Sequence, residues 1–313
     1  MTTRPSRSTV VLHRPATACL DTRQTAWAWG AARLGAAGLA GEEARLEAEV
    51  LLRHAAALTR EELFTRPADP LPPQAAASFA ALIEQRATGR PTAYLVGHRE
   101  FFGAKFMVDE RVLIPRPETE CLVEVVRDGL VAHLAPVIVE IGTGSGAVAI
   151  TLARLLPRAR VIATDCSGGA LEMARMNAAR LGVADRITWI RGDGLLPLAG
   201  LGLEDAVDAV VSNPPYVRTS DLAVLPREVR EHEPRAALDG GPDGLSVHRA
   251  IIGEADRYLR ASGALVLEVA ALGDQARAVA ALVAARPGFA PPRIVRDYAG
   301  LDRIVVAARG GEA

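Results

Sequence analysis

The sequence predicts an α/β protein with a doubly wound, mostly parallel sheet, preceded by a small helical domain and a β-hairpin. Three observations predict this fold. Short apolar runs alternate with helical stretches from Pro136 onward, helical periodicity fills most of 21–93, and extended residues with two glycines lie between. The chain has 313 residues, half of them apolar, which is enough for two domains with buried cores.

The first domain, residues 21–93, is expected to be helical. An apolar stripe at helical spacing joins Ala44, Ala48, Leu51, Leu52 and Ala55. Thr59-Arg60-Glu61-Glu62 has the capping-box pattern of a helix start, and a further helical pattern runs from Gln74 to Gln85.

Residues 94–114 switch to extended character, which predicts a β-hairpin linking the two domains. Gly97 and Gly103 alternate there with the large side chains of Phe101, Phe102, Phe106 and Val108. The second domain is then expected to span 115–313.

Seven apolar runs predict the strands of the second domain. They cover 137–141, 161–164, 187–190, 207–212, 264–269, 293–296 and 303–307. Helical stretches between most of them imply a parallel sheet covered on both faces. Only a short turn around Gly300 separates the last two runs, so these should pair antiparallel and place a hairpin at one end of the sheet.

Charge and cysteine usage exclude several classes of function. The net charge of −1 lacks the basic excess that duplex-binding proteins use to neutralise phosphates, so a protein or small-molecule substrate is favoured and no stable nucleic acid partner is expected. Three isolated cysteines suggest neither a disulfide framework nor a metal site. The chain reads as cytoplasmic, and no apolar run is long enough to span a membrane.

Residues 1–20 stand apart from the rest of the sequence. They carry Arg4, Arg7 and Arg14 without an acidic residue, a composition that a mitochondrial transit peptide can share. A disordered extension is the favoured interpretation.

A glycine-rich loop follows the first strand of the predicted sheet. It reads Glu140-Ile141 and then Gly142, Thr143, Gly144, Ser145 and Gly146. Glycines let the chain turn sharply and bring its backbone against a ligand, which the next helix faces with its amide groups. The loop also fits the dinucleotide fingerprint of a dehydrogenase, and a tight turn without a ligand is the simplest alternative.

Two acidic residues lie where later strands end. Asp165 closes the second strand, where a carboxylate can accept hydrogen bonds from ribose hydroxyls. Asp193, followed by Gly194, closes the third strand and can reach the exocyclic amine of an adenine. A surface aspartate in a Gly-Asp-Gly turn is the alternative for Asp193.

The Asn213-Pro214-Pro215-Tyr216 tetrad directly follows the strand 207–212, at the edge where open α/β sheets hold ligands. The Asn213 side-chain oxygen and the Pro214 carbonyl can each accept one N–H of a planar NH₂ group, and Tyr216 can lie flat against that group. Such a slot aims a weakly nucleophilic nitrogen at a sulfonium methyl without a metal or a general base. Common turn material is the alternative.

With these motifs the chain resembles the bacterial release-factor glutamine N5-methyltransferases, the PrmC/HemK family, from about Ala44 to Ala308. The most specific stretches are RVLIPRPETE at 111–120, EIGTGSG at 140–146, SNPPY at 212–216 and EPRAALDGGPDGL at 233–245.

The resemblance implies a class I S-adenosylmethionine-dependent methyltransferase with a seven-stranded sheet. Its substrate would be the glutamine of the Gly-Gly-Gln loop of a peptide chain release factor in translation termination, and its by-product S-adenosylhomocysteine. Gly142 to Gly146 would line the cofactor, Asp165 would hold its ribose, and Asp193 with Gly194 would border its adenine. Asn213 to Tyr216 would form the glutamine slot, and Asn213 would also border the cofactor.

The resemblance also implies that the helical domain 21–93 helps to recognise the release factor, and it assigns roles to two further segments. Residues 116–119 would wall the cofactor pocket, and 233–245 would cover the site. The chain departs from the family at Pro91-Thr92-Ala93-Tyr94, where Pro-Leu-Gln-Tyr is frequent, and at Gly194, where a bulky aromatic can occur. The first departure bears on the substrate contacts and the second on the packing of the adenine.

Three alternatives stay open from the sequence. A glutamine methyltransferase for a ribosomal protein or another amide substrate would use the same tetrad. A nucleic-acid adenine N6-methyltransferase also holds its flipped base in an Asn-Pro-Pro-Tyr slot, but the near-neutral charge and the absence of a large target-recognition domain oppose it. A non-catalytic cofactor-binding adaptor would have no need of Asn213.

Overall fold

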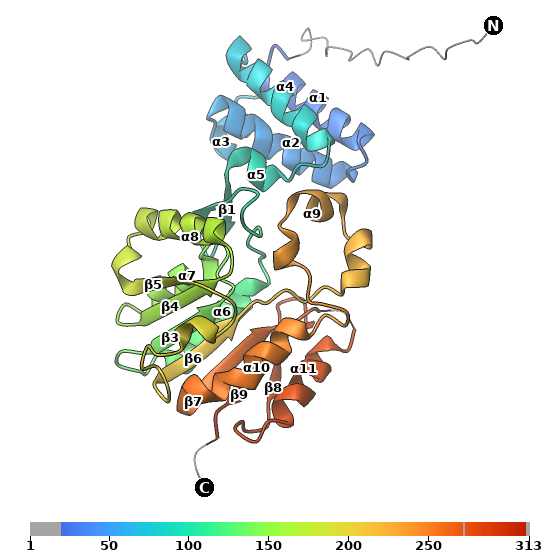
Figure 1. Ribbon diagram of the computed structural model, residues 1–313. Coiled ribbons are helices and arrows are strands. Elements are labelled where there is room, and N and C mark those ends of the chain that lie inside the picture. Colours follow the sequence, from blue (N-terminus) through green and yellow to red (C-terminus); the bar gives the residue numbers. More distant parts are fainter. Residues whose placement is uncertain (1–19, 272, 311–313) are drawn as a thin grey trace, which may run out of the picture. The chain divides into compact units, whose positions relative to one another are not determined.

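The computed structural model describes residues 20–271 and 273–310, and the chain divides into two compact units between Val96 and Gly97 (Figure 1). The expected extension therefore lies outside the described residues, apart from Leu20. That residue is buried in the core of the helical unit.

The N-terminal unit is helical, as predicted. Its helices are α1 (Arg23–Ala36), α2 (Gly41–Ala56), α3 (Arg60–Thr65), α4 (Pro73–Ala87) and α5 (Thr92–Val96). The apolar stripe of α2 faces the core, where Leu51 and Leu52 are fully buried. The capping box is confirmed, because the Thr59 hydroxyl accepts from the Glu62 amide and the Glu62 carboxylate accepts from the Thr59 amide.

Residues 94–96, predicted to begin the hairpin, instead complete helix α5. The Tyr94 amide donates to the Pro91 carbonyl, and the Thr92 hydroxyl donates to Glu47 of α2. These contacts with the helical unit override the extended character of the local sequence. The hairpin itself is present further on, as β1 (His98–Phe101) and β2 (Ala104–Met107). Phe102 and Gly103 form its two-residue turn with φ of 50° and 69°, as in a type I′ turn.

The second unit contains the predicted seven-stranded sheet, in the order β5-β4-β3-β6-β7-β9-β8. Its strands are β3 (Val137–Ile141), β4 (Arg160–Asp165), β5 (Ile187–Arg191), β6 (Val207–Ser212), β7 (Leu259–Glu268), β8 (Arg293–Arg296) and β9 (Asp302–Ala308). The first five are parallel, and β8 and β9 form the predicted antiparallel hairpin at the edge. Strand β9 lies between β7 and β8, antiparallel to both.

Strand β7 begins five residues before the apolar run that predicted it. Its first part contains Ser262 with φ of 63° and Gly263, and the pairing with β6 shifts register between Val207 and Ala209. A Cβ on Gly263 would lie 2.8 Å from the Val207 carbonyl oxygen, so glycine permits this close approach.

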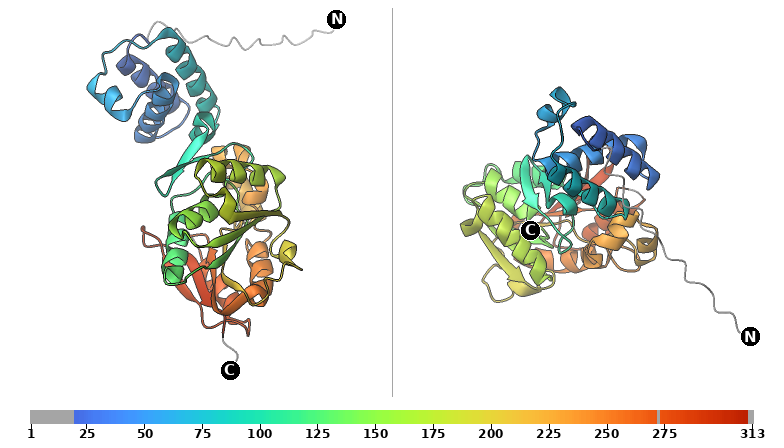
Figure 2. Two further views of the ribbon diagram at one scale, coloured as in Figure 1. Left: turned by 90° about the vertical axis from the view of Figure 1, so that its left-hand side faces the viewer. Right: turned by 90° about the horizontal axis from the view of Figure 1, so that it is seen from above.

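Helices cover both faces of the sheet (Figure 2). Helices α6 (Thr119–Leu130), α7 (Ala147–Leu155) and α8 (Gly168–Arg180) contribute to one core cluster, and α10 (Ser246–Tyr258) and α11 (Gln275–Ala284) to the other. A short helix α9 (Arg227–His232) lies in the long connection between β6 and β7. Because β3 to β7 run parallel, the segments that follow their carboxyl ends meet at one edge of the sheet.

Candidate active site

The glycine-rich loop leaves β3 and enters α7 in a conformation that only glycine adopts without strain. Gly142, Gly144 and Gly146 have φ of 73°, 54° and 81°. The Gly142 and Thr143 amides donate to the Thr164 carbonyl of β4, at 2.9 and 3.1 Å. At Gly142 and Gly144 a Cβ would meet no described heavy atom within 4 Å beyond the neighbouring residues, so the backbone there is open to a ligand.

Glu140, in strand β3, holds the glycine loop in place by hydrogen bonds to one residue in the loop and to one in the helix that follows it. Its carboxyl group is buried and accepts from the Thr143 hydroxyl at 2.6 Å and from the Ala149 amide at 3.1 Å. Burial raises the pKa of Glu140 to about 8, although these two hydrogen bonds act in the opposite direction. The carboxyl group therefore connects both ends of the loop rather than facing a ligand.

Asp165 lies at the end of β4, beside this loop. Its carboxylate accepts from the Gly144 amide at 2.9 Å and from the Ser167 amide at 2.8 Å. The structure thus brings Asp165 and the glycine loop together. Each carboxylate oxygen keeps further acceptor capacity, which leaves room for the predicted bond to a hydroxyl.

Asp193 and Gly194 follow β5 on the other side of β4. Asp193 is exposed, and Gly194 has φ of 56° with no described heavy atom within 4 Å of a Cβ position beyond its neighbours. The Gly194 carbonyl accepts from the Thr164 hydroxyl at 3.1 Å. Both residues therefore border the edge where the glycine loop and Asp165 lie.

The Asn-Pro-Pro-Tyr segment leaves β6 immediately beside the glycine loop. The Ser212 hydroxyl, one residue earlier, donates to the Ile141 carbonyl at 2.8 Å, which joins the two strand ends. Asn213 is half-buried, and its Nδ2 donates to the Thr119 hydroxyl at 3.1 Å. Because Nδ2 faces Thr119, the Asn213 Oδ1 atom is turned away from Thr119.

The segment 233–245 packs directly against the tetrad. The Gln275 side chain donates to the carbonyls of Tyr216 and Gly244, at 3.0 and 3.1 Å, and so joins the two segments. A Cβ on Gly240 would lie 2.7 Å from the Pro215 carbonyl oxygen, which explains glycine at that position. Burial raises the pKa of the Tyr216 phenol to about 12, so Tyr216 stays neutral.

A pocket of about 210 Å³ opens beside the tetrad. Its lining residues are mostly apolar: Leu113, Arg116, Asn213, Pro214, Tyr216, Val217, Leu225, Val229, Ala237 and Leu238. Arg116 is held by an ion pair to the buried Glu233 at 2.7 Å. An apolar pocket with few polar groups is typical of a site that orients a small substrate group.

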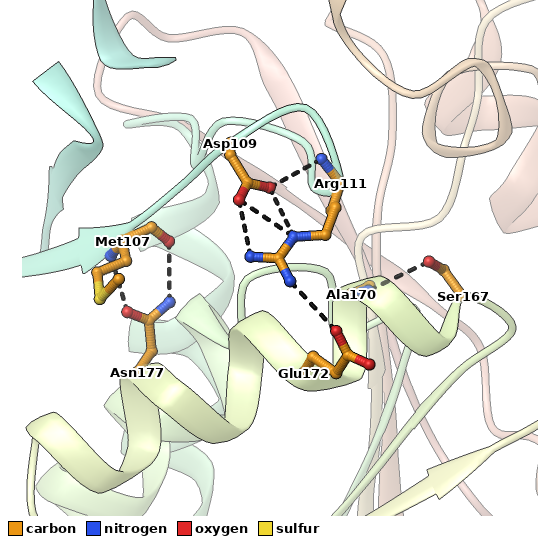
Figure 3. A network of polar contacts seen from close by, with 7 residues as sticks. All are labelled: Met107, Asp109, Arg111, Ser167, Ala170, Glu172 and Asn177. Atoms are coloured by element: carbon orange, nitrogen blue, oxygen red, sulfur yellow. Dashed lines mark hydrogen bonds and ion pairs between the residues drawn. The ribbon is translucent and has the colours of Figure 1, made fainter. Parts of the chain in front are cut away.

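Helix α8 contacts both the end of the hairpin and the glycine loop, and Figure 3 shows its contacts with the hairpin end at Met107. The Asn177 side chain accepts from the Met107 amide at 2.7 Å and donates to the Met107 and Ser145 carbonyls at 3.0 and 2.9 Å. Arg111 pairs with Asp109 and with Glu172 of α8 (Figure 3). The diagnostic stretch 111–120 therefore contacts α8 near its beginning, through Arg111, and Asn213 near its end, through Thr119.

Sequence reasoning missed three polar residues of this region. Asn177, Glu268 and Gln275 belong to none of the predicted motifs, yet the first two are buried and the third joins two segments of the site. A signal existed for two of them. Asn177 interrupts the apolar face of a helix, and Glu268 ends an apolar strand at the edge where ligands bind.

Residues 116–119 lie on the tetrad side of the site. Arg116 lines its pocket and Thr119 contacts Asn213. A role for this segment in walling the cofactor pocket stays a prediction. Within the part of the chain that the structure describes, no group of three His, Cys, Asp or Glu side chains could hold a metal ion, and no helix is long and apolar enough to cross a membrane.

The fold and site define a class I methyltransferase domain: a sheet with an antiparallel seventh strand inserted next to β7, and a glycine-rich loop after the first parallel strand. A family model described as "Methyltransferase domain" matches residues 138–232, and one described as "PrmC N-terminal domain" matches residues 25–97.

Two relatives extend the match to nearly the whole chain. A release factor glutamine methyltransferase from Moorella thermoacetica is 48% identical over 90% of this chain and 96% of its own length. One from Cereibacter sphaeroides is 42% identical over 88% of this chain and 94% of its own length. The chain belongs to the release factor glutamine methyltransferase family.

A solved structure of the hMettl16 catalytic domain, in complex with an RNA hairpin, shares the fold. Its TM-score is 0.53 at 18% identity, over 74% of this chain and 82% of that one. At this identity the likeness concerns the fold alone.

Proposed function

We propose that this chain transfers a methyl group from S-adenosylmethionine to the side-chain amide nitrogen of the glutamine in the Gly-Gly-Gln loop of a peptide chain release factor. It would act in the cytoplasm, in translation termination. The observation that supports this proposal most directly is the position of the Asn213–Tyr216 segment. It lines a pocket, and Ser212 joins it to the end of β3, where the glycine loop begins. The named relatives support the substrate.

The donor side fits S-adenosylmethionine. Gly142, Gly144 and Gly194 leave open space beside their backbone, and Asp165 has acceptor capacity for ribose hydroxyls. We assign the donor to Gly142–Gly146, Asp165, Asp193 and Gly194, with Asn213 between donor and acceptor. When bound, the donor supplies a methyl group already activated by its sulfonium.

On the acceptor side, Asn213 Oδ1 and the Pro214 carbonyl oxygen each accept one N–H of the glutamine amide. Both prolines stiffen the loop and so fix where the Pro214 carbonyl points. Tyr216 stacks on the planar amide and remains uncharged, since the pKa of its phenol is raised to about 12. Holding both hydrogens orients the nitrogen, and two oxygen acceptors stabilise positive charge that develops on it.

Two features support a protein substrate over a nucleic acid. The net charge is −1, and the pocket wall is largely apolar. We further propose that the helical unit, which matches the PrmC N-terminal domain model, recognises the release factor.

The test is mass spectrometry of a purified release factor incubated with this protein and isotopically labelled S-adenosylmethionine. We expect one labelled methyl group on the Gly-Gly-Gln glutamine. A label on a ribosomal protein or on DNA adenine, with an unmodified release factor, would contradict the proposal and favour one of its rivals.

A further inference from the structure

Glu268 is a buried acid that the proposed chemistry does not use. It ends β7 with 1% of its surface exposed, and neither carboxyl oxygen has a hydrogen-bonded partner among the described residues. An unpartnered buried carboxyl group costs free energy and calls for a specific explanation.

The nearby cations are already engaged elsewhere. Arg303 pairs with Asp297 at 3.0 Å, and Arg116 pairs with Glu233 at 2.7 Å. Glu268 is therefore not the anionic half of an ion pair. Its burial raises its pKa to about 7, and the Thr119 hydroxyl is close enough to lower that pKa in part. Thr119 and Glu268 are thus neighbours, but the geometry of the structure does not meet the criteria for a hydrogen bond between them.

Glu268 and Asn213 lie at the ends of neighbouring strands, on the same face of the sheet. Val211 and Val266 belong to the core cluster on the α6 side, and side chains two residues apart share a face of a strand. Two residues further on, Asn213 and Glu268 come to the same side. Thr119, the first residue of α6, adjoins both, since it accepts from Asn213 Nδ2 at 3.1 Å.

The direction of these contacts decides how the Asn213 amide is turned. An amide offers a donor on one side and an acceptor on the other, and a hydroxyl can play either role. A carboxylate only accepts. When Glu268 is ionised, the Thr119 hydroxyl donates its proton to Glu268 and must accept from Asn213, which turns Nδ2 toward Thr119.

We propose that Glu268 and Thr119 are positioning residues that orient the Asn213 amide: Thr119 donates to the Glu268 carboxylate and accepts from Asn213 Nδ2, so that Asn213 Oδ1 faces the substrate amide. This inference rests on the proposed function of Asn213. It explains why the fold retains an acid without a cation partner at this place.

Protonation of Glu268 would remove the constraint. A neutral carboxyl group can donate to Thr119, which then donates to Asn213 Oδ1 and turns Nδ2 toward the substrate N–H groups. Turnover should therefore be highest above the pKa of Glu268 and fall as pH decreases through about 7. The other charged or titratable groups near Glu268 are Arg116, Glu118, Cys121, Tyr216, Arg303 and His248, whose Nε2 hydrogen-bonds the Glu268 carbonyl.

The first experiment uses four variants of the full chain with release factor as substrate. Thr119→Val should lower kcat by about 10- to 100-fold through misorientation of Asn213, with an unchanged donor Kd. Thr119→Ser should retain most of kcat. Glu268→Gln should lose the decline in kcat at acidic pH. Thr151→Val is the matched control: it removes a buried hydroxyl that bonds the Ala147 carbonyl within α7, and should leave kcat intact.

A wild-type kcat in Thr119→Val, an equal loss in Thr119→Ser, or an acidic decline that persists in Glu268→Gln would overturn the positioning role. Failure of the wild-type protein to methylate glutamine would instead contradict the proposed function.

A neutron structure tests the orientation of the Asn213 amide without a measurement of turnover. Above the pKa of Glu268, the Thr119 deuteron should point to Glu268 and an Asn213 Nδ2 deuteron to Thr119. The reverse arrangement would refute the inference.

Discussion

The glycine-rich loop after β3 and the Asn-Pro-Pro-Tyr segment after β6 lie at the same edge of the sheet but are built in opposite ways. The first uses positive-φ glycines with open backbone, and its acid, Glu140, is satisfied by two hydrogen bonds. The second uses prolines and a side-chain amide, and its neighbouring acid, Glu268, has no hydrogen-bonded partner among the described residues.

The difference follows from what we propose that each segment holds, the donor for the loop and the glutamine amide for the tetrad. A large cofactor can be held by backbone groups, so the glycine loop has to keep a fixed shape, which hydrogen bonds with Asp165 and Asn177 support. A single amide must be held at both hydrogens, so the orientation of one side chain matters and neighbours must set it. Substitutions in the two segments should therefore affect different measured quantities.

The largest expected effect is on the acceptor side. Asn213→Ala removes one of the two oxygens that we propose to hold the amide, and should lower kcat by roughly 10²–10³, with donor affinity nearly unchanged. Kinetics with release factor, and calorimetry with the donor, measure the two quantities. Normal turnover in this variant would refute the slot assignment.

Asp165→Ala should have the opposite profile. It removes the predicted acceptor for the ribose and also frees the Gly144 and Ser167 amides that it now orders. We expect the donor Kd to rise by about 10- to 100-fold, the size of one or two charged hydrogen bonds. An unchanged dissociation constant by calorimetry would contradict the ribose role.

Glu140 tests whether the loop's acid is purely structural. The pKa of Glu140 is raised to about 8, so the folded state retains a proton that the unfolded chain loses above its ordinary value of 4.5. Its contribution to stability is thus complete below that value and is lost as pH rises toward 8. From pH 5 to pH 7 the free energy of unfolding of the wild type should therefore fall by roughly 2 kcal/mol on account of Glu140. Denaturant unfolding should show a smaller decline in Glu140→Gln, and an identical one would refute the raised pKa.

Two glycines of one loop form a matched pair with the smallest expected effects. Gly146→Ala would place a Cβ 2.7 Å from Ile150 Cδ1 and should lower the free energy of unfolding by about 2 kcal/mol. In Gly144→Ala the added Cβ would lie in open space, so the free energy of unfolding should fall by only about 1 kcal/mol. Donor binding, however, should be weakened more by Gly144→Ala than by Gly146→Ala. Thermal unfolding and calorimetry compare them. Equal losses of donor affinity would show that the open space is not the donor site.

Periodicity and turn chemistry were sufficient to predict the helical unit, all seven strands and the terminal antiparallel hairpin. Alternation of apolar runs and the short turn at Gly300 are local signals, and the structure confirms them. The start of the hairpin at residue 94 was wrong, because contacts of Thr92 with Glu47 keep α5 helical. Those contacts join residues 45 positions apart and leave no trace in local propensity.

The sequence by itself determined which chemistry-bearing residues follow which strand, since the glycine loop, Asp165 and the Asn213 tetrad are each contiguous with an apolar run. Only the tertiary structure decided which neighbours complete them: Thr119 beside Asn213, Gln275 beside Tyr216, and Asn177 beside Ser145. The physical reason is that strand periodicity specifies the face on which a side chain lies. The donor or acceptor that it meets there comes from another element, through packing that no local pattern encodes.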